Sequence, residues 1–323
     1  MITKIFGTGG IGTGVLFKFS SDRPLTRDES RPARLTDCKD YCKGHIILHY
    51  AAALTGGVRV YAIGIVGDDE HGARLISEMT DAGVDARFVA KTREARTMYS
   101  VCFQYPDGAG GNITASNSAS ALVTPGYIEE CAGRPPFIDG DSIVVSAPEV
   151  PVRSRIRLLE IGRRAGAYNV SSFLAEEAYE FMASGGIELS ELISINRGEA
   201  LALTGGEAGS DDAQKTASAA AEIIFKINPF AALIVTAGAD GSFVCEAGRV
   251  TKIPRYGTDI VSTAGAGDAY LGGTIAGLAS GLGLVDSARY GAAAAGVAVT
   301  SEHTIAAEVT AENIKKFFGK DLT

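Results

Sequence analysis

The 323-residue sequence has no tryptophan, few aromatic residues and no long block of one charge. Lys and Arg number 30 against 38 Asp and Glu, which gives a formal net charge of −8. A chain with this acidic balance and no basic run is a poor ligand for nucleic acid or an anionic membrane, so we expect neither as a partner. Because 46% of the residues are apolar and 21% charged, the composition is that of a folded globular protein and excludes a disordered one.

Cysteine is also scarce, with five residues that stand far apart in the chain. An odd number of widely spaced cysteines argues against a disulfide framework and favours a reducing compartment. The first residues lack the apolar core of a signal peptide, and the uncharged run 269–285 is too short and too rich in Gly and Ser for a membrane span. We therefore expect a cytoplasmic location.

What the chain does contain is an alternation of strand and helix patterns. Near-continuous apolar runs such as 58–66 and Ser142–Ser146 predict buried parallel strands. They alternate with helical patterns such as 37–54 and Val152–Ala165. This predicts an α/β fold with a doubly wound, mostly parallel central sheet flanked by helices. No repeat or linker marks a boundary, so residues 1–323 are expected to form a single domain.

Two segments depart from this pattern. Residues 18–36 are polar and contain two prolines, and residues 97–105 alternate as a half-buried strand before a turn-rich stretch. We expect approximately residues 13–36 and 96–118 to form a small β lid over a site, with an ordinary hairpin as the alternative. Apolar lid strands leave a face to be covered, so we also expect a homodimer through the lid.

The most informative stretch runs from residue 258 to 283, where a β-branched strand gives way to small residues and then to an uncharged helical pattern over 269–282. At its head stand Gly265, Ala266, Gly267 and Asp268. A helix N-terminus preceded by glycine offers free N–H groups and a positive dipole end, which attract phosphate. A carboxylate at that point can accept a proton from an attacking hydroxyl. From these residues alone, a tight turn with Asp268 as a helix cap explains the pattern equally well.

Further polar residues follow two other predicted strands. Asn196 and Glu199 come after one strand, and Thr236 and Gly238 after the next. In doubly wound sheets, ligands bind at the carboxyl ends of the parallel strands. We therefore expect these residues to share one edge of the sheet with residues 265–268.

The glycines at 7, 9 and 12 point to a different class of enzyme, because Gly7, Gly9 and Gly12 fit the dinucleotide pattern G-x-G-x-x-G. A strand precedes them, and Asp28 or Glu29 could bind the ribose. The helix that should follow has no counterpart in the pattern of residues 18–36. An NAD-dependent enzyme built on residues 7–12 is the alternative from another class, and a binding protein without catalysis is a third.

Four motifs in chain order are similar to those of the ribokinase-like (PfkB) carbohydrate kinase family, and the resemblance covers nearly the whole chain. They are GIVGDDEHG from residue 64, the NxxE pattern of Asn196 and Glu199, the TxGxxG turn that starts at Thr236, and STAGAGD, which ends at Asp268. In the last motif, Ser262 stands where the family has a leading Asp. Four motifs in the right order are far more specific than any one of them.

The resemblance implies an ATP-dependent kinase that phosphorylates a hydroxyl of a sugar or sugar-like polyol, with a nucleoside acceptor as the close alternative. It implies that Asp268 is the base that deprotonates the acceptor hydroxyl. The backbone N–H groups of Gly265, Ala266 and Gly267 would hold the charge that develops on the transferred γ-phosphoryl group. Preorganised electrostatics of this kind is what phosphoryl transfer requires.

The cofactor residues carried over from the family are the other two motifs. Asn196 and Glu199 would organise Mg²⁺, partly through water, since this ion keeps several waters. Thr236, Gly238 and Gly241 would bring the backbone close to the phosphates and ribose of ATP.

The departures from the family lie on the acceptor side. Family members carry an Asp soon after the first strand, where this chain has glycines, Ile and Thr at 10–13, and Ile46 replaces an Asn that contacts the substrate. The candidates that refill the pocket are Gly12, Lys43, Gly44, His45, Asn112 and Asn117. Solvated lid residues are the alternative. Ser262 in place of Asp leaves activation by a monovalent cation open.

Overall fold

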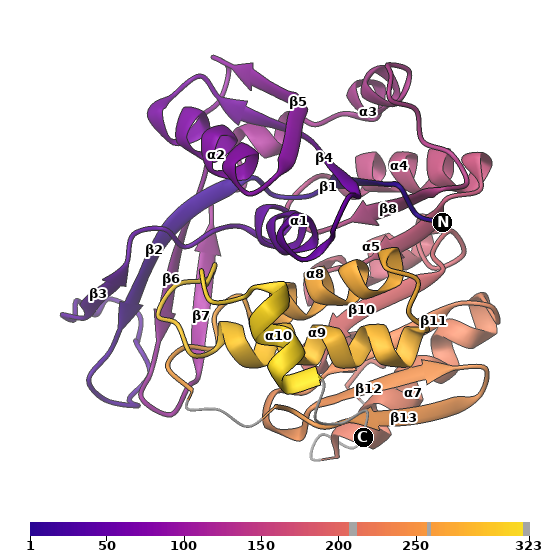
Figure 1. Cartoon of the computed structure of the whole chain (residues 1–323). Coiled ribbons are helices and arrows are strands. Elements are labelled where there is room, and N and C mark those ends of the chain that lie inside the picture. The colour runs from indigo at the N-terminus through magenta and orange to yellow at the C-terminus, as the bar shows by residue number, and fades with distance from the viewer. Residues whose placement is uncertain (207–211, 257–259, 319–323) are drawn as a thin grey trace.

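The computed structural model describes residues 1–206, 212–256 and 260–318, and Figure 1 shows the whole chain. The first two residues of the 258–283 stretch, Thr258 and Asp259, lie outside the described residues.

A nine-stranded sheet runs through the centre of the molecule in the order β13-β12-β11-β10-β9-β8-β1-β4-β5. Its pairs are parallel from β5 to β11, and the pairs β11–β12 and β12–β13 at one edge are antiparallel. The strands are β1 (Lys4–Thr8), β4 (Arg59–Gly67), β5 (Val84–Thr92), β8 (Ser142–Ser146), β9 (Tyr168–Ser171), β10 (Leu192–Asn196), β11 (Ala232–Thr236), β12 (Ser242–Glu246) and β13 (Arg249–Ile253). The predicted α/β fold with a mostly parallel sheet is confirmed.

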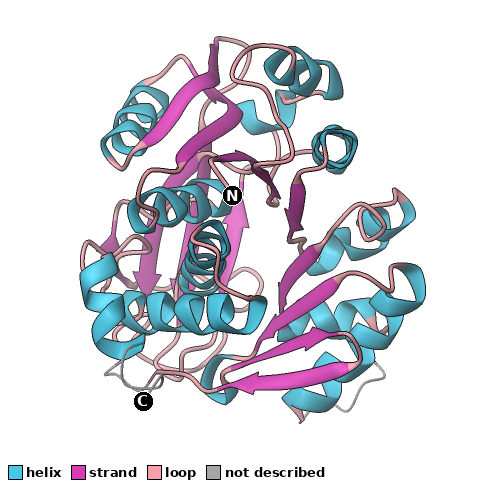
Figure 2. Cartoon of the chain, turned by 45° about the vertical axis from the view of Figure 1, so that its right-hand side comes forward, coloured by secondary structure: helices cyan, strands magenta, loops and turns pink. Residues whose placement is uncertain are grey.

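Helices cover both faces of this sheet (Figure 2). They are α1 (Lys43–Leu54), α2 (Glu70–Asp81), α3 (Pro125–Ala132), α4 (Val152–Ala165), α5 (Ala178–Ala183), α6 (Arg197–Leu203), α7 (Ala213–Ile227), α8 (Ala266–Ala279), α9 (Leu284–Ala298) and α10 (Ala311–Phe318). Three short 3₁₀ turns are η1 (Ala119–Leu122), η2 (Ala175–Glu177) and η3 (Gly238–Asp240). In the described part of the chain, no helix combines the length and the apolar character needed to cross a membrane.

The alternation of side chains along each strand divides the apolar residues between two cores. In β1, Phe6 packs in one core with Leu159 of α4, whereas Ile5 packs in the other with Ile275 of α8. Successive side chains of a strand point to opposite faces, so a sheet buried on both sides reads as a continuous apolar run. This is why the predicted parallel strands were visible in the sequence.

A second, four-stranded sheet lies at one side of the main body (Figure 1). Its order is β3-β2-β6-β7, with β2 and β6 parallel and the other pairs antiparallel. The strands are β2 (Gly12–Lys18), β3 (Arg34–Asp37), β6 (Met98–Gln104) and β7 (Gly110–Thr114). The action of this small sheet as a lid stays a prediction.

The glycine-rich loop after β1 does not lead into a helix. Thr8 ends β1, and Gly12 already begins β2 of the small sheet. A dinucleotide site needs a helix N-terminus at this point to receive the pyrophosphate. The NAD-binding interpretation of residues 7–12 is therefore wrong, because these glycines connect β1 directly to β2.

Candidate active site

The carboxyl ends of β10 and β11 and the start of α8 meet in one cleft. Asn196 at the end of β10 and Thr236 at the end of β11 are register partners in adjacent parallel strands. The cleft has a volume of about 400 Å³ and is lined by Asn196, Thr236, Gly238, Gly241, Gly265, Ala266, Gly267 and Asp268. The structure thus brings together all the residues predicted to bind nucleotide or transfer phosphate, except Glu199, which lines an adjoining small cavity with Asn196 and Asp268.

The loop that leads into α8, residues 262–267, is here called the phosphate loop. It needs glycine at the N-cap of α8. Gly265 has φ 74° and its Cβ position would lie 2.8 Å from the carbonyl oxygen of Thr304, so a side chain is excluded by both backbone and space. The N–H of Ala266 donates to the carbonyl oxygen of Thr263 at 3.3 Å. The N–H groups of Gly265 and Gly267 find no backbone acceptor among the described residues, which leaves them for an anion.

Asp268 stands in the first turn of α8 and faces the first residue of α1. Its Oδ1 lies 3.7 Å from Nζ of Lys43. Burial raises the pKa of Asp268, and the Lys43 ammonium opposes this rise. In turn, the Asp268 carboxylate raises the pKa of Lys43. A carboxylate with a raised pKa is the better proton acceptor, so the site favours general-base chemistry.

Asn196 and Glu199 form a capping box at the N-terminus of α6. The N–H of Glu199 donates to Asn196 Oδ1 at 2.9 Å, and the N–H of Asn196 donates to Glu199 Oε2 at 2.7 Å. Glu199 is only 8% exposed, and burial raises the pKa of its carboxyl. The capping box uses Oε2 and leaves Oε1 for another partner. One buried carboxylate oxygen beside a phosphate cleft suits Mg²⁺, which takes few protein ligands and keeps waters.

Ser262 shapes the same loop from inside. It is 2% exposed, and its hydroxyl accepts a hydrogen bond from the N–H of Ala264 at 3.3 Å. The position therefore offers an engaged hydroxyl where the family has a carboxylate.

A wider cleft of about 1110 Å³ adjoins this first cleft on the side of the small sheet. Of the predicted acceptor residues, Lys43 and Asn112 line it, together with Met98 of β6 and Thr114 of β7. Lys43 also lines the nucleotide cleft. The two clefts therefore share Lys43 and Asn196, and the Lys43 ammonium lies 3.7 Å from Asp268 of the nucleotide cleft, so a nucleotide and a second substrate can bind side by side.

The structure does not bring the remaining acceptor candidates to this cleft. Gly12 and Gly44 serve close packing, since a Cβ on Gly12 would lie 2.6 Å from Cys42 Sγ and one on Gly44 would lie 2.7 Å from Gly9 Cα. His45 is completely buried in α1, and its ring packs against Tyr41. It is thus an interior histidine, as expected of a ring on the apolar face of a helix.

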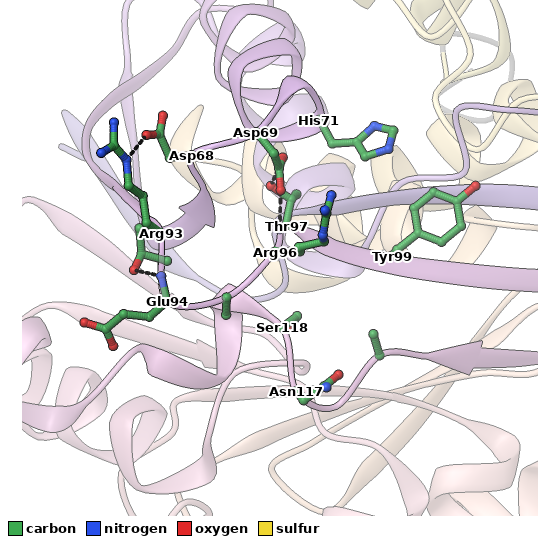
Figure 3. A pocket seen from close by; sticks show the side chains of 13 residues that line it. Asp68, Asp69, His71, Arg93, Glu94, Arg96, Thr97, Tyr99, Asn117 and Ser118 are labelled. Carbon is green, nitrogen blue, oxygen red and sulfur yellow. Dashed lines mark hydrogen bonds and ion pairs between the residues drawn. The ribbon is translucent and has the colours of Figure 1, made fainter.

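Asn117 lies in a separate cavity at the root of the small sheet, beside α2 (Figure 3). This cavity has a volume of about 830 Å³. Asp69 lines the cavity and joins α2 to the β5–β6 connection, because its carboxylate accepts from the N–H groups of Gly72 and Thr97, each at 2.9 Å. Arg93 is paired with Asp68 at 2.8 Å. The GDDEHG segment therefore caps α2 and anchors the β5–β6 connection, away from the phosphate loop.

Glu149, which follows β8, is a site residue that the sequence reasoning missed. It has φ 72°, a left-handed conformation that is uncommon outside glycine and often marks functional sites. Its Oε2 accepts from the N–H of Lys43 at 3.0 Å, and burial raises the pKa of its carboxyl to about 7. Gly10 lies so close to this carboxylate that a side chain there would collide with it. The signal available in the sequence was its place after a parallel strand, at the same edge as Asn196.

Comparison with known proteins points to one family. A family model described as pfkB family carbohydrate kinase matches residues 48–311. The 5-dehydro-2-deoxygluconokinase of Listeria monocytogenes is 26% identical over 274 residues, covering 80% of this chain and 81% of that protein.

Solved ribokinases share the fold. The ribokinase of Giardia lamblia has a TM-score of 0.85 at 18% identity, covering 99% of this chain and 100% of that one. A putative ribokinase II of E. coli, solved with ATP and Mg²⁺, has a TM-score of 0.76 at 19% identity, covering 99% and 100%. Since the family model spans most of the sequence, the chain belongs to the pfkB family of carbohydrate kinases.

Proposed function

We propose that this carbohydrate kinase transfers the γ-phosphoryl group of ATP to a hydroxyl of a sugar or sugar-like polyol, with Asp268 as the general base. The observation that carries the proposal is the convergence at Asp268. Asp268 shares the nucleotide cleft with Gly265 and Gly267, and it lies 3.7 Å from the ammonium of Lys43, which also lines the wider cleft.

The roles of the residues follow from their positions. Asp268 takes the proton of the acceptor hydroxyl as the oxygen attacks phosphorus, and Lys43 balances negative charge beside it. The N–H groups of Gly265 and Gly267 stabilise the charge on the equatorial phosphoryl oxygens. Thr236, Gly238 and Gly241 hold the nucleotide.

Mg²⁺ belongs to this proposal at the family level, since the E. coli relative was solved with ATP and Mg²⁺. Bound Mg²⁺ neutralises charge on the transferred phosphates. In this chain, Glu199 is the residue that would hold it, through Oε1 and water, and Asn196 keeps the Glu199 carboxylate in place through the capping box.

For the acceptor, a sugar is favoured over a nucleoside. The relatives are named ribokinase and 5-dehydro-2-deoxygluconokinase, and both names describe kinases of sugars or their acids. Glu149 and Asn112, which line the wider cleft from different segments of the chain, offer hydrogen-bond partners to hydroxyl groups.

The test is ADP release with ATP, Mg²⁺ and a panel of sugars, polyols and nucleosides. We expect ADP release that depends on a sugar or polyol. Release with nucleosides alone would favour the alternative acceptor, and absence of acceptor-dependent release over the whole panel would contradict a kinase. In a thermal-shift assay, a non-hydrolysable ATP analogue should stabilise the protein and NADH should not.

A further inference from the structure

The acceptor cleft is lined by side chains of one predominant charge. Among the described residues that line it, the carboxylates are Glu149, Glu176, Glu177 and Glu199, and the cation is Lys43. The ammonium of Lys43 lies 3.7 Å from Asp268, so its charge is already opposed by the base. An anionic group on the acceptor would therefore meet carboxylates and no uncommitted cation.

One further cation lies behind the cleft wall, and it does not reach the ligand. Arg155 of α4 is completely buried, and its Nη1 donates to Glu177 Oε2 at 2.8 Å. It also donates to the carbonyl oxygen of Ser172. Arg155 thus fixes the Glu177 carboxylate from behind and offsets that one charge, and it is not available to an anion in the cleft.

The neutral part of the lining is suited to hydroxyl groups. Asn112 and Thr114 of β7 and Ser116 just after it line the cleft, and their side chains donate and accept hydrogen bonds without charge. The volume of this cleft, about 1110 Å³, is large enough to hold more than one sugar ring.

We propose that the natural acceptor is a polyhydroxylated molecule that carries no carboxylate or phosphate, and that the cleft carboxylates reject anionic sugars. This inference rests on the proposed function, because it names the acceptor class for the same site. An anion in this cleft would lose hydration next to like charges, which is a strong means of discrimination. Neutral polyols and amine-bearing sugars do not meet that cost. The relative from Listeria is named for a gluconate, a sugar acid, so the proposal separates this chain from it.

The first experiment compares matched acceptors in the ADP-release assay. Each set contains a neutral sugar or polyol, its amino derivative, its aldonate and its phosphate ester. We expect kcat/KM for the neutral or amino member to exceed that for the anionic members by about tenfold or more. Aldonates or phosphate esters used as well as their neutral counterparts would overturn the inference and leave the kinase proposal standing. Absence of release with every acceptor would overturn the kinase proposal itself.

The second experiment reverses one charge of the cleft. Glu176 is exposed and lines the cleft, whereas Glu180, four residues on in α5, is exposed and does not line it. We expect Glu176→Lys to lower the ratio of neutral to aldonate kcat/KM by roughly fivefold, since the change places a cation beside the acceptor. Glu180→Lys makes the same charge change elsewhere and should leave the ratio within about twofold. Equal ratios in the two variants would show that cleft charge does not select the acceptor.

Discussion

At the scale of single residues, Gly265 and Glu149 are two of the left-handed positions in the site, beside Gly238 and Gly241. Gly265 turns the chain into α8, and Glu149 turns its carboxylate toward α1. Gly265 belongs to the STAGAGD motif, so it could be recognised from the sequence. Glu149 follows β8 in a loop that carries no motif, and the fold is needed to show that its carboxylate accepts from the N–H of Lys43.

We expect Gly265→Ala to lower kcat strongly. The new Cβ would lie 2.8 Å from the carbonyl oxygen of Thr304, so the phosphate loop must shift. Gly248 is a matched control, because it also has φ 74° but has open space around its Cβ position. Gly248→Ala should therefore cost stability through backbone strain alone, about 1 kcal/mol, and leave kcat near the wild-type value. Equal kcat in the two variants would contradict a role for this loop in transfer.

Glu149 predicts how stability depends on pH. Its folded pKa, about 7, lies above the ordinary value of 4.5 for a glutamate, so the folded state favours the protonated carboxyl. The stability from this group is present below pH 4.5 and is lost as the pH rises through 7. We expect Glu149→Gln to raise the free energy of unfolding relative to wild type by roughly 1–3 kcal/mol at pH 8, and by less at pH 5.

The measurement for Glu149 is urea unfolding at both pH values. Glu176→Gln, at an exposed position, serves as the control and should show no such pH-dependent difference. A difference between Glu149→Gln and wild type that is the same at pH 5 and pH 8 would contradict a raised pKa.

At the scale of elements, two hydrogen bonds join the small sheet to the phosphate loop. Gln104 Nε2 at the end of β6 donates to Thr263 Oγ1 at 3.3 Å, and Lys18 Nζ at the end of β2 donates to the carbonyl oxygen of Val261 at 3.0 Å. The small sheet is thus tied to the residues that precede α8, as expected of a lid whose closure completes the site.

We expect Gln104→Leu to raise KM for the acceptor about 2–10-fold, because one hydrogen bond of about 0.5–1.5 kcal/mol is lost from the closed form. Its effect on the melting temperature should be small, since Gln104 and Thr263 are not in the core. Gln214→Leu changes an exposed glutamine on α7 and should leave KM unaltered. A KM for Gln104→Leu equal to that of the control would contradict coupling between the small sheet and the loop.

Two elements, α1 and β7, differ from what the local sequence pattern predicts. The sequence predicts a helix over 37–54, but α1 begins only at Lys43. The N–H groups of Asp40 and Cys42 donate to the carbonyl oxygens of Gly14 and Gly12, so pairing with β2 overrides the local helical pattern. Strands buried on both faces were predictable from their apolar runs, whereas β7 has a polar, exposed pattern and was not.

In the site, too, one part could be predicted from the sequence and the other could not. The phosphate loop and nucleotide turn consist of glycines and single polar residues in fixed spacing, which a sequence displays directly. The acceptor side is assembled from Lys43, Asn112 and Glu149, which lie on three distant segments. His45 and Asn117 could not be excluded in advance, because burial in α1 and the direction of the chain after β7 are properties of the fold.

At the scale of the whole molecule, the outer face of the small sheet predicts a dimer. Met98 and Asn112 line the acceptor cleft, so side chains one position along their strands point away from it. Among these, Tyr99 is 37% and Ile113 68% exposed. Exposed apolar side chains on an accessible sheet invite a partner, and a second copy of the chain is the one that we propose.

We expect light scattering to give a dimer for the wild type, and Ile113→Lys to shift the equilibrium toward the monomer by placing a charge in the interface. Phe230→Lys alters another exposed aromatic position, 92% exposed and distant from the small sheet in sequence, and should leave the dimer intact. A wild-type monomer at working concentration would contradict the proposal.

The most direct test of the central claim is the turnover of Asp268→Asn. With the preferred acceptor, we expect a loss of about 10²–10⁴ in kcat, because general-base catalysis is removed, while ATP-analogue binding in a thermal-shift assay persists. Asp286→Asn makes the same change in the first turn of α9, outside the clefts, and should keep wild-type turnover. A kcat for Asp268→Asn within a few-fold of the Asp286→Asn value would contradict the assignment of Asp268 as the base.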